Sequence, residues 1–225
     1  MRDTTRRRSS RSRAVARCSR FWRGAWRVRA PPGRVRRVPR AGLTTDVVIE
    51  RAAELLERAP GAELTLAAVA GSLGVRAPSL YKHVDGLPGL RRGIMLRAKR
   101  SLGDALAQAT IGRSGAEAVR GISVAYRQWA LANPAQYPLT IAAAIEGDAE
   151  DTAAGETALR VIYTVLAGYG LEGEDAVDAT RFLRATIHGF VSLETSGAFR
   201  LPVSIESSYE RVVESLVVGL EAWGR

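Results

Sequence analysis

From Gly42 onward, apolar residues recur with the spacing of amphipathic helices. Thr45 is placed to cap the first of these helices, and Asp46 complements the positive end of its dipole. Pro60 and Gly61 end the pattern. The apolar stripe between them follows an i, i+4, i+7, i+8 spacing and consists of Val48, Ala52, Leu55, Leu56 and Ala59.

Two shorter helices follow, with Gly74 between them. Thr65 caps the first, whose apolar positions are Leu66, Val69, Ala70 and Leu73. Pro78 suits the first turn of the second, in which Leu80 and Val84 face inward. Glycine tolerates the left-handed backbone that a tight turn needs, so the two helices can cross steeply and share a small core with Val75.

The rest of the chain continues with helical spacing. A fourth helix carries Leu90, Ile94, Ala98, Leu102 and Ala105. Further helices are predicted at about 115–132, 135–146, 153–169, 174–197 and 205–223, separated by glycine- and proline-containing breaks. No segment alternates convincingly as a strand, so the predicted fold class is all-α.

Polar side chains gather on one face of the third short helix. With Leu80 and Val84 inside, Lys82 points outward, and Ser79, Tyr81 and His83 flank it. A cation, a hydroxyl and two hydrogen-bonding aromatic rings on one face are suited to contact bases and phosphates in a major groove. An ordinary helical hairpin with no role in DNA binding is the alternative interpretation.

From Gly42 to about Arg97 the chain resembles the DNA-binding domain of the TetR-type repressor family. The resemblance rests on five stretches, which occur in the family's order: 42–44, 52–56, 66–70, 73–75 and 79–84. It implies a homodimer that binds a palindromic operator of double-stranded DNA. It also implies that Thr65 contacts phosphate, and that the major groove and its flanking phosphates are contacted by Ala77, Ser79, Tyr81, Lys82 and His83.

The chain departs from the family at the start of the fourth helix. Many members carry a phosphate-contacting lysine there, where this chain has Leu87. Arg91 or Arg92 would replace that contact, and Asp85 would cap the helix instead.

The C-terminal half resembles a TetR subgroup whose regulatory domain carries a Trp-His-Gly signature. The similar stretches are 126–137 and 183–199, and the tripeptide here is Ile187-His188-Gly189, without the tryptophan. In this architecture the last two helices of each subunit form a four-helix bundle in the dimer. The faces expected to contribute are Phe182, Ala185, His188, Gly189 and Leu193 on one helix, and Val212, Val213, Leu216, Val217 and Leu220 on the other. These faces serve equally well as intrachain core.

The resemblance further implies a regulatory domain that binds a small apolar effector molecule. Rings with occasional hydroxyls are suited to such a pocket. The candidate effector-binding residues are Tyr126, Trp129, Tyr137, Ile141, Tyr163 and Phe182, for which plain core packing is the alternative. His188 is expected to be a hydrogen-bonded core or interface histidine.

Charge is distributed unevenly along the chain. Residues 1–41 hold 15 of the 33 basic residues and one of the 23 acidic residues, which leaves 18 basic and 22 acidic residues in 42–225. The composition of 1–41 predicts a disordered arm that binds DNA without sequence preference. Alternatives are a non-native stretch upstream of the true start, or a transit peptide. The predicted organisation is this arm, a helix-turn-helix domain over 42–90 and a regulatory domain over 91–225.

Several function classes lack their sequence signatures. Cys18 is the single cysteine, and the two histidines form no zinc-ligand spacing. No nucleophile elbow, phosphate-binding loop or dinucleotide motif is present, so no catalytic residue, metal or cofactor is expected. The acids of 146–151 are interpreted as a solvated loop. No apolar run approaches the length of a membrane span, which favours a cytoplasmic protein. The competing hypotheses are a sequence-neutral nucleic-acid-binding protein that acts through its arginine-rich arm and a helical enzyme.

Overall fold

The computed structural model describes residues 42–59 and 61–224. Helix α1, Thr45–Arg58, begins at the residue predicted to cap it, one position earlier than expected. Thr44 is the N-cap, and its hydroxyl accepts from the Val47 amide at 3.3 Å. The expectation that Thr45 caps the helix is wrong, because its hydroxyl donates instead to the carbonyl oxygen of His83 at 3.2 Å. This bond ties the start of α1 to the end of the third helix.

The next two elements form a helix-turn-helix. Helix α2, Leu66–Leu73, is capped as predicted by Thr65, whose hydroxyl accepts from the Ala68 amide. Gly74 then adopts a left-handed conformation with φ 70°, which a residue with a Cβ rarely adopts. The third element, η2, Ala77–Lys82, is a 3-10 helix with Pro78 in its first turn. It is therefore a tighter and shorter helix than the pattern indicated.

A first hydrophobic core joins these elements to the start of α3, Gly86–Thr110. Its fully buried side chains come from α1, α2, η2 and α3, and include Val48, Ala52, Val69, Leu73, Leu80, Leu90 and Ile94. We call this unit, residues 42–94, the head. Leu90 and Ile94 of α3 belong to the core of the head. The predicted domain boundary at residue 90 therefore falls inside the head and within a continuous helix.

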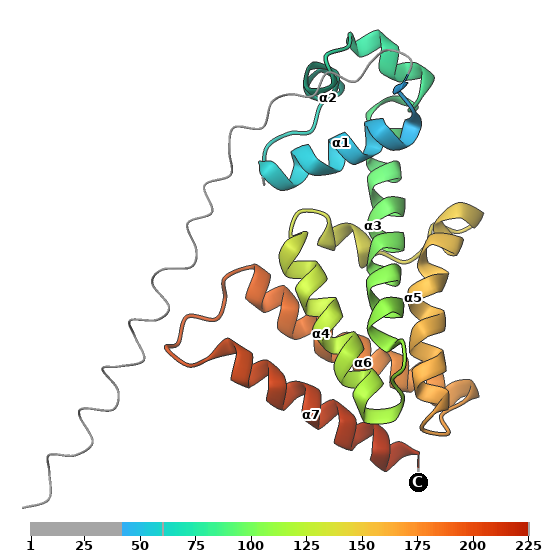
Figure 1. The fold of residues 1–225 in the computed structure, drawn as a ribbon, viewed down its shortest axis with the longest axis vertical. Coiled ribbons are helices and arrows are strands. Elements are labelled where there is room, and N and C mark those ends of the chain that lie inside the picture. Colours follow the sequence, from blue (N-terminus) through green and yellow to red (C-terminus); the bar gives the residue numbers. More distant parts are fainter. Residues whose placement is uncertain (1–41, 60, 225) are drawn as a thin grey trace, which may run out of the picture. The chain divides into compact units, whose positions relative to one another are not determined.

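The second core is formed by the rest of α3 with α4, Gly115–Ala132, α5, Ala149–Ala167, α6, Gly173–Thr195, and α7, Ile205–Trp223. Figure 1 shows α3 running from the head into this helical bundle. The long helix contacts α1 at one end and α4 and α5 further along. The described residues contain no strand, which confirms the all-α class.

The predicted helix over 135–146 is wrong. The segment holds only the 3-10 turn η3, Tyr137–Thr140, followed by irregular chain up to Asp148. Pro138 lies in that turn and has no amide hydrogen to continue a helix. The Ile145 amide donates instead to the Asp151 carboxylate at 3.0 Å, and this bond holds the irregular segment that precedes α5.

The acidic residues of 146–151 are not a solvated loop. Asp148 is the N-cap of α5 and accepts from the Asp151 amide, so this helix begins four residues earlier than predicted. Asp151 is fully buried and forms an ion pair with Lys99 of α3. None of the helices in the described ranges is long and apolar enough to cross a membrane.

Candidate DNA interface and ligand cavity

The head exposes the side chains that the sequence placed on the recognition face. Leu80 is 0% exposed, whereas its neighbour Tyr81 is 64% exposed and Lys82 is exposed as well. Ser79 and His83 are half-buried on either side of them. The arrangement follows from the tight turn of η2, which buries one side chain and leaves the next two outside. A phenol ring this exposed contributes little to the core and is available to an external partner.

Thr65 and Ala77 lie at the edges of this face. The Thr65 oxygen accepts from a backbone amide, so its own O–H remains able to donate to an anion at the start of α2. Ala77 is half-buried against the head core. Tyr81 and Lys82 therefore form the exposed centre, and the other four candidates are half-buried.

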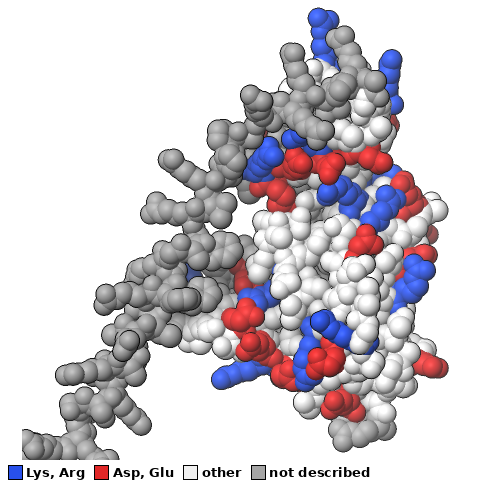
Figure 2. Space-filling model, viewed as in Figure 1, with Lys and Arg blue, Asp and Glu red and all other residues white. Residues whose placement is uncertain are grey.

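Ion pairs with acidic side chains determine which arginines outside this face can contact a phosphate. The Arg92 guanidinium forms ion pairs with Asp148 at 2.7 Å and Glu150 at 2.9 Å, so the expectation that Arg92 replaces a phosphate contact is wrong. Arg91 is exposed and remains the candidate. Asp85 occupies the N-cap position of α3 but makes no side-chain capping bond. Figure 2 shows acidic and basic side chains interspersed on the face that it presents, with no continuous patch of one sign among the described residues.

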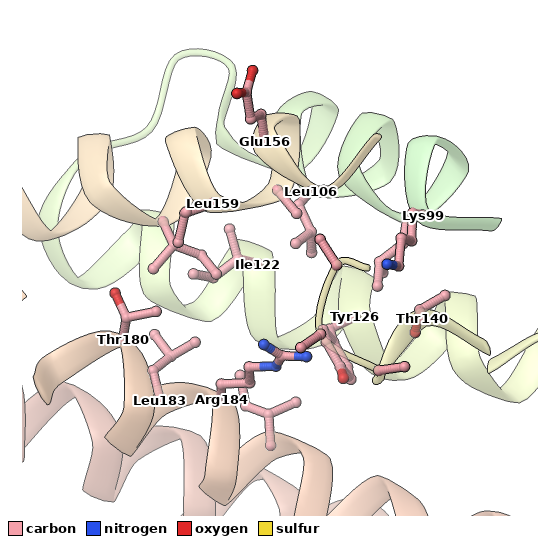
Figure 3. Close-up of a pocket in the computed structure, with 18 of the residues that line it drawn as sticks. Lys99, Leu106, Ile122, Tyr126, Thr140, Glu156, Leu159, Thr180, Leu183 and Arg184 are labelled. Atoms are coloured by element: carbon pink, nitrogen blue, oxygen red, sulfur yellow. The ribbon is translucent and has the colours of Figure 1, made fainter. Parts of the chain in front are cut away.

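A cavity of about 310 Å³ lies between helices of the second core. Its lining is mostly apolar and comes from α3, α4, α5 and α6, together with the chain after η3 (Figure 3). The apolar lining includes Leu102, Leu106, Ile122, Leu159, Ile162, Leu183 and Ile187. The volume lies at the lower end of the range of about 300–1,000 Å³ that is usual for small-molecule sites.

A few polar groups line this cavity. Lys99 and Asp151 lie 2.5 Å apart and neutralise each other. Tyr126 and Thr140 present hydroxyls, and Arg184 presents a guanidinium. An apolar cavity with a few converging polar groups is the usual form of a ligand-binding site.

Of the six residues predicted to line an effector pocket, Tyr126 alone lines this cavity. Tyr137 lies directly behind it, with the two hydroxyl oxygens 3.3 Å apart, and the Tyr137 hydroxyl is 2.6 Å from Nδ1 of His188. His188 is thus a hydrogen-bonded histidine, as expected. Ile141 packs against the core nearby.

The remaining three candidates have other positions. Trp129 is buried and donates from its indole nitrogen to the Ser101 hydroxyl at 3.0 Å. Phe182 stacks on Trp223, with ring centroids 5.3 Å apart, and is therefore part of the α6–α7 packing. Tyr163 is half-buried on α5 and does not line the cavity. For Trp129 and Phe182 the core interpretation fits the structure.

Tyr126, Tyr137 and His188 form a hydrogen-bonded aromatic chain beside the cavity, and burial shifts the pKa of each of them. Burial raises the pKa of the Tyr126 phenol and that of the Tyr137 phenol, so both hydroxyls stay protonated at neutral pH. Burial, assisted by the positive charge of Arg184, lowers the pKa of His188. Tyr126, the member of this chain that lines the cavity, therefore presents a neutral hydroxyl there.

Sequence reasoning missed the other polar residues of the cavity. Lys99 and Asp151 are separated by 52 residues, and no local pattern pairs them. Arg184 resembles any surface arginine of an amphipathic helix. Part of the cavity wall is formed by Ala142, Ala143 and Ala144, whose methyl side chains carry no functional group that would identify a site in the sequence.

A hydrogen-bonded clasp links the head to the second core. Glu57 of α1 accepts from the backbone amides of Ala135 and Gln136 at 3.1 and 2.9 Å. It also accepts from the Gln136 side chain at 3.1 Å, and Gln136 is 3% exposed. The residue after Gln136 is Tyr137, so one short segment contacts both the head and the aromatic chain beside the cavity.

The fold and these two sites together are those of a helix-turn-helix protein whose second core contains a cavity. Residues 119–216 match the family model described as the tetracyclin repressor-like C-terminal domain. An uncharacterized HTH-type transcriptional regulator of Mycobacterium tuberculosis is 34% identical over 182 residues, which cover 80% of this chain and 83% of that protein. The chain belongs to the TetR family of helix-turn-helix transcriptional regulators.

Further comparisons agree on the fold. An uncharacterized HTH-type transcriptional regulator of Bacillus subtilis, YobS, is 30% identical over 182 residues, covering 81% of this chain and 95% of that protein. A crystal structure of TetR from Acinetobacter baumannii in complex with minocycline superposes with a TM-score of 0.59 at 18% identity, covering 81% of this chain and 99% of the other. At that identity the superposition shows a shared fold.

Proposed function

We propose that this protein is a homodimeric transcriptional repressor that binds a palindromic DNA operator and leaves it when a small apolar effector occupies the cavity. The observation that carries the proposal is the exposed pair Tyr81 and Lys82 next to fully buried Leu80, in a head that shares α3 with the cavity. The separation of a reading surface from a ligand cavity, with one helix common to both, suits a regulator. In this arrangement no residue is assigned a catalytic role.

The DNA interface in this proposal is centred on η2. Lys82 pairs with a phosphate, while Ser79, Tyr81 and His83 meet base edges or flanking phosphates, and Thr65 donates to a phosphate at the start of α2. Ala77 packs against the groove wall. Two copies are needed because one short helix contacts few base pairs. Their recognition elements would lie about 34–36 Å apart to match one turn of DNA.

The dimer would form through α6 and α7, with a smaller contact face than the sequence indicated. Val213, Leu216, Val217 and Leu220 are buried within the chain, so that face of α7 belongs to the intrachain core. The part of α6 that remains exposed carries Ala185, Gly189 and Leu193, which recur every four residues. Val218 of α7 is 62% exposed. Small residues on such a face allow close approach of two helices.

Coupling between the sites would pass through α3 and the Glu57 clasp. A ligand between α3 and α5 favours the arrangement of helices that holds it best, and it shifts the equilibrium only by its differential affinity for the two arrangements. Tilting α3 moves the two heads of the dimer and changes their spacing. A coupling of about 1–3 kcal/mol, or roughly 5- to 150-fold in operator affinity, is typical of such systems.

The subgroup, the organisation and the location are also part of the proposal. The stretches that resemble the Trp-His-Gly subgroup, 126–137 and 183–199, both fall within the range matched by the family model, 119–216. The division into a DNA-binding and a regulatory part is kept, with the boundary moved into α3 by the head core. A protein that acts on operators works beside the chromosome, which supports a cytoplasmic location.

A first experiment tests DNA recognition. Sequences bound by the full chain are selected from random DNA, and fluorescence anisotropy then measures the affinity of the selected operator for Lys82→Ala and for Arg58→Ala, an exposed control on α1. Lys82→Ala should weaken binding and reduce the salt slope by about one phosphate equivalent, with an unchanged melting temperature. Equal affinities of Lys82→Ala and the wild type would refute the recognition surface.

A second candidate function rests on the arginine content of residues 1–41, which lie outside the described residues. A sequence-neutral nucleic-acid-binding protein would act through this arm alone. Deleting 1–41 separates the two functions, because a repressor should still discriminate its operator from random DNA after the deletion. The two affinities should fall by similar factors.

A further inference from the structure

Four charged side chains line the cavity, Lys99, Asp151, Glu156 and Arg184, and Arg184 is the cation among them that no carboxylate of the described residues neutralises. Lys99 is neutralised by Asp151 at 2.5 Å, so it offers a ligand no net charge. Arg184 forms no ion pair with any carboxylate among the described residues, and its one hydrogen bond is donated to the carbonyl oxygen of Ile141 at 2.9 Å. A guanidinium has five N–H donors, so most of them remain available.

The orientation of the charged side chains makes this cation relevant to a ligand. Figure 3 shows the Arg184 guanidinium among the side chains of the cavity, beside Tyr126, whereas the carboxylate of Glu156 is directed away from them. The field of Arg184 also reaches Tyr126, Tyr137 and His188: burial raises the pKa of the two phenols and the charge of Arg184 opposes this, whereas in His188 burial lowers the pKa and the charge of Arg184 adds to this. Its bond to Ile141 holds the side chain over the chain that follows η3.

The size of the cavity limits the ligand. An apolar cavity of about 150 Å³ accommodates benzene, which has six non-hydrogen atoms. A cavity of about 310 Å³ therefore takes about twelve such atoms. One guanidinium balances one negative charge, and the remaining lining is largely apolar. A doubly charged phosphate would leave one negative charge unbalanced in this site.

Resting on the proposed effector function, we propose that the ligand is an apolar molecule of about twelve non-hydrogen atoms that carries one carboxylate. Its hydrocarbon part occupies the cavity between α3, α4, α5 and α6. Its carboxylate accepts hydrogen bonds from Arg184 and lies within reach of the Tyr126 hydroxyl. A carboxylate paired with a guanidinium forms shorter and stronger hydrogen bonds than a neutral group does.

The test uses three probes of one chain length: decanoate, decan-1-ol and decylammonium. Isothermal titration calorimetry on the full chain measures their affinities. The wild type should bind decanoate about tenfold more tightly than decan-1-ol, and decylammonium most weakly. Arg184→Gln should remove the preference for decanoate and leave decan-1-ol binding unchanged. Arg181→Gln is the matched control, because Arg181 lies one turn away on α6 and pairs with Asp178.

The outcomes separate this inference from the proposed function. Equal binding of decanoate and decan-1-ol by the wild type, an unchanged preference in Arg184→Gln, or no binding of any probe would each overturn the carboxylate assignment. Operator binding of the same samples is measured by anisotropy. Intact operator binding together with one of these results would overturn only the ligand class, whereas the absence of any preferred DNA sequence would overturn the regulator.

Discussion

Breaking the buried ion pair between Lys99 and Asp151 should be one of the most destabilising single changes in the second core. Lys99 is 7% exposed and Asp151 is 0% exposed, and the two charged atoms lie 2.5 Å apart. Asp151 also accepts from the Ile145 amide at 3.0 Å, so both of its oxygens have partners. Removing one member leaves the other charge desolvated and unpaired, which costs about 3–5 kcal/mol in buried pairs.

Lys99→Met and Asp151→Asn test this magnitude. Each variant should lower the free energy of unfolding by about 3–5 kcal/mol and the melting temperature by on the order of 10 °C. The double variant should cost much less than the sum of the two, because it leaves no unpaired charge. Urea unfolding of the wild type, the two single variants and the double variant forms a double-mutant cycle.

Arg100→Ala is the control for this cycle. Arg100 pairs with Glu150 at 2.9 Å, but both side chains are about half exposed, at 53% and 51%. Water screens such a pair, so its loss should cost at most about 1 kcal/mol. The reasoning fails if Lys99→Met and Asp151→Asn cost no more than this control. It also fails if their effects add within about 0.5 kcal/mol.

Two further predictions concern the contacts around this pair. Glu57→Ala should cost about 1–3 kcal/mol of stability, because it removes an acceptor shared by the Ala135 amide and buried Gln136, and it should reduce the effect of an effector on operator affinity. Glu54→Ala, which breaks a partly exposed pair with Arg51, is the control in both measurements. Acid should destabilise the wild type between about pH 4 and pH 2. The Arg92 hydrogen bond lowers the pKa of Asp148 from 3.8 to about 2. The contribution of Asp148 to stability is therefore complete above its pKa in the unfolded state and is lost as the pH falls through its pKa in the folded state. Although burial opposes it, the Lys99 bond also lowers the pKa of Asp151. Urea midpoints that do not change between pH 5 and pH 2 would contradict this.

Helices with a clear apolar stripe could be predicted from the sequence with good boundaries. The expected helix at 115–132 corresponds to Gly115–Ala132, and the one at 205–223 to Ile205–Trp223. The turn at Gly74 and the cap at Thr65 were also predictable, because each depends on the chemistry of one residue and its immediate neighbours. The exposure of Tyr81 and Lys82 followed from the burial of Leu80 in the same way.

Features set by distant contacts were not predictable. The alanine-rich segment 142–144 has a helical composition, but Asp151 takes the Ile145 amide and Tyr137 bonds to His188, and both contacts hold the segment in another shape. The aromatic residues expected in the pocket were assigned by chemical suitability. The fold instead uses Trp129 and Phe182 for core packing and lines the cavity with aliphatic side chains, which carry no signal in a sequence.

The close packing of α3 explains why one helix suffices to connect the two sites. A Cβ at Gly93 would lie 2.5 Å from Cδ1 of Ile49 on α1, and a Cβ at Gly103 would lie 3.0 Å from Cβ of Thr157 on α5. The helix thus packs closely on α1 at one glycine and on α5 at another, ten residues further along. Packed interfaces of this kind shift between discrete arrangements and do not deform gradually. A ligand that separates α5 from α3 near Gly103 should therefore displace Ile49, and with it the orientation of the recognition surface. A long side chain in place of Gly93 or Gly103 would leave a gap elsewhere in the packing of α3 and weaken the coupling between the cavity and the recognition surface.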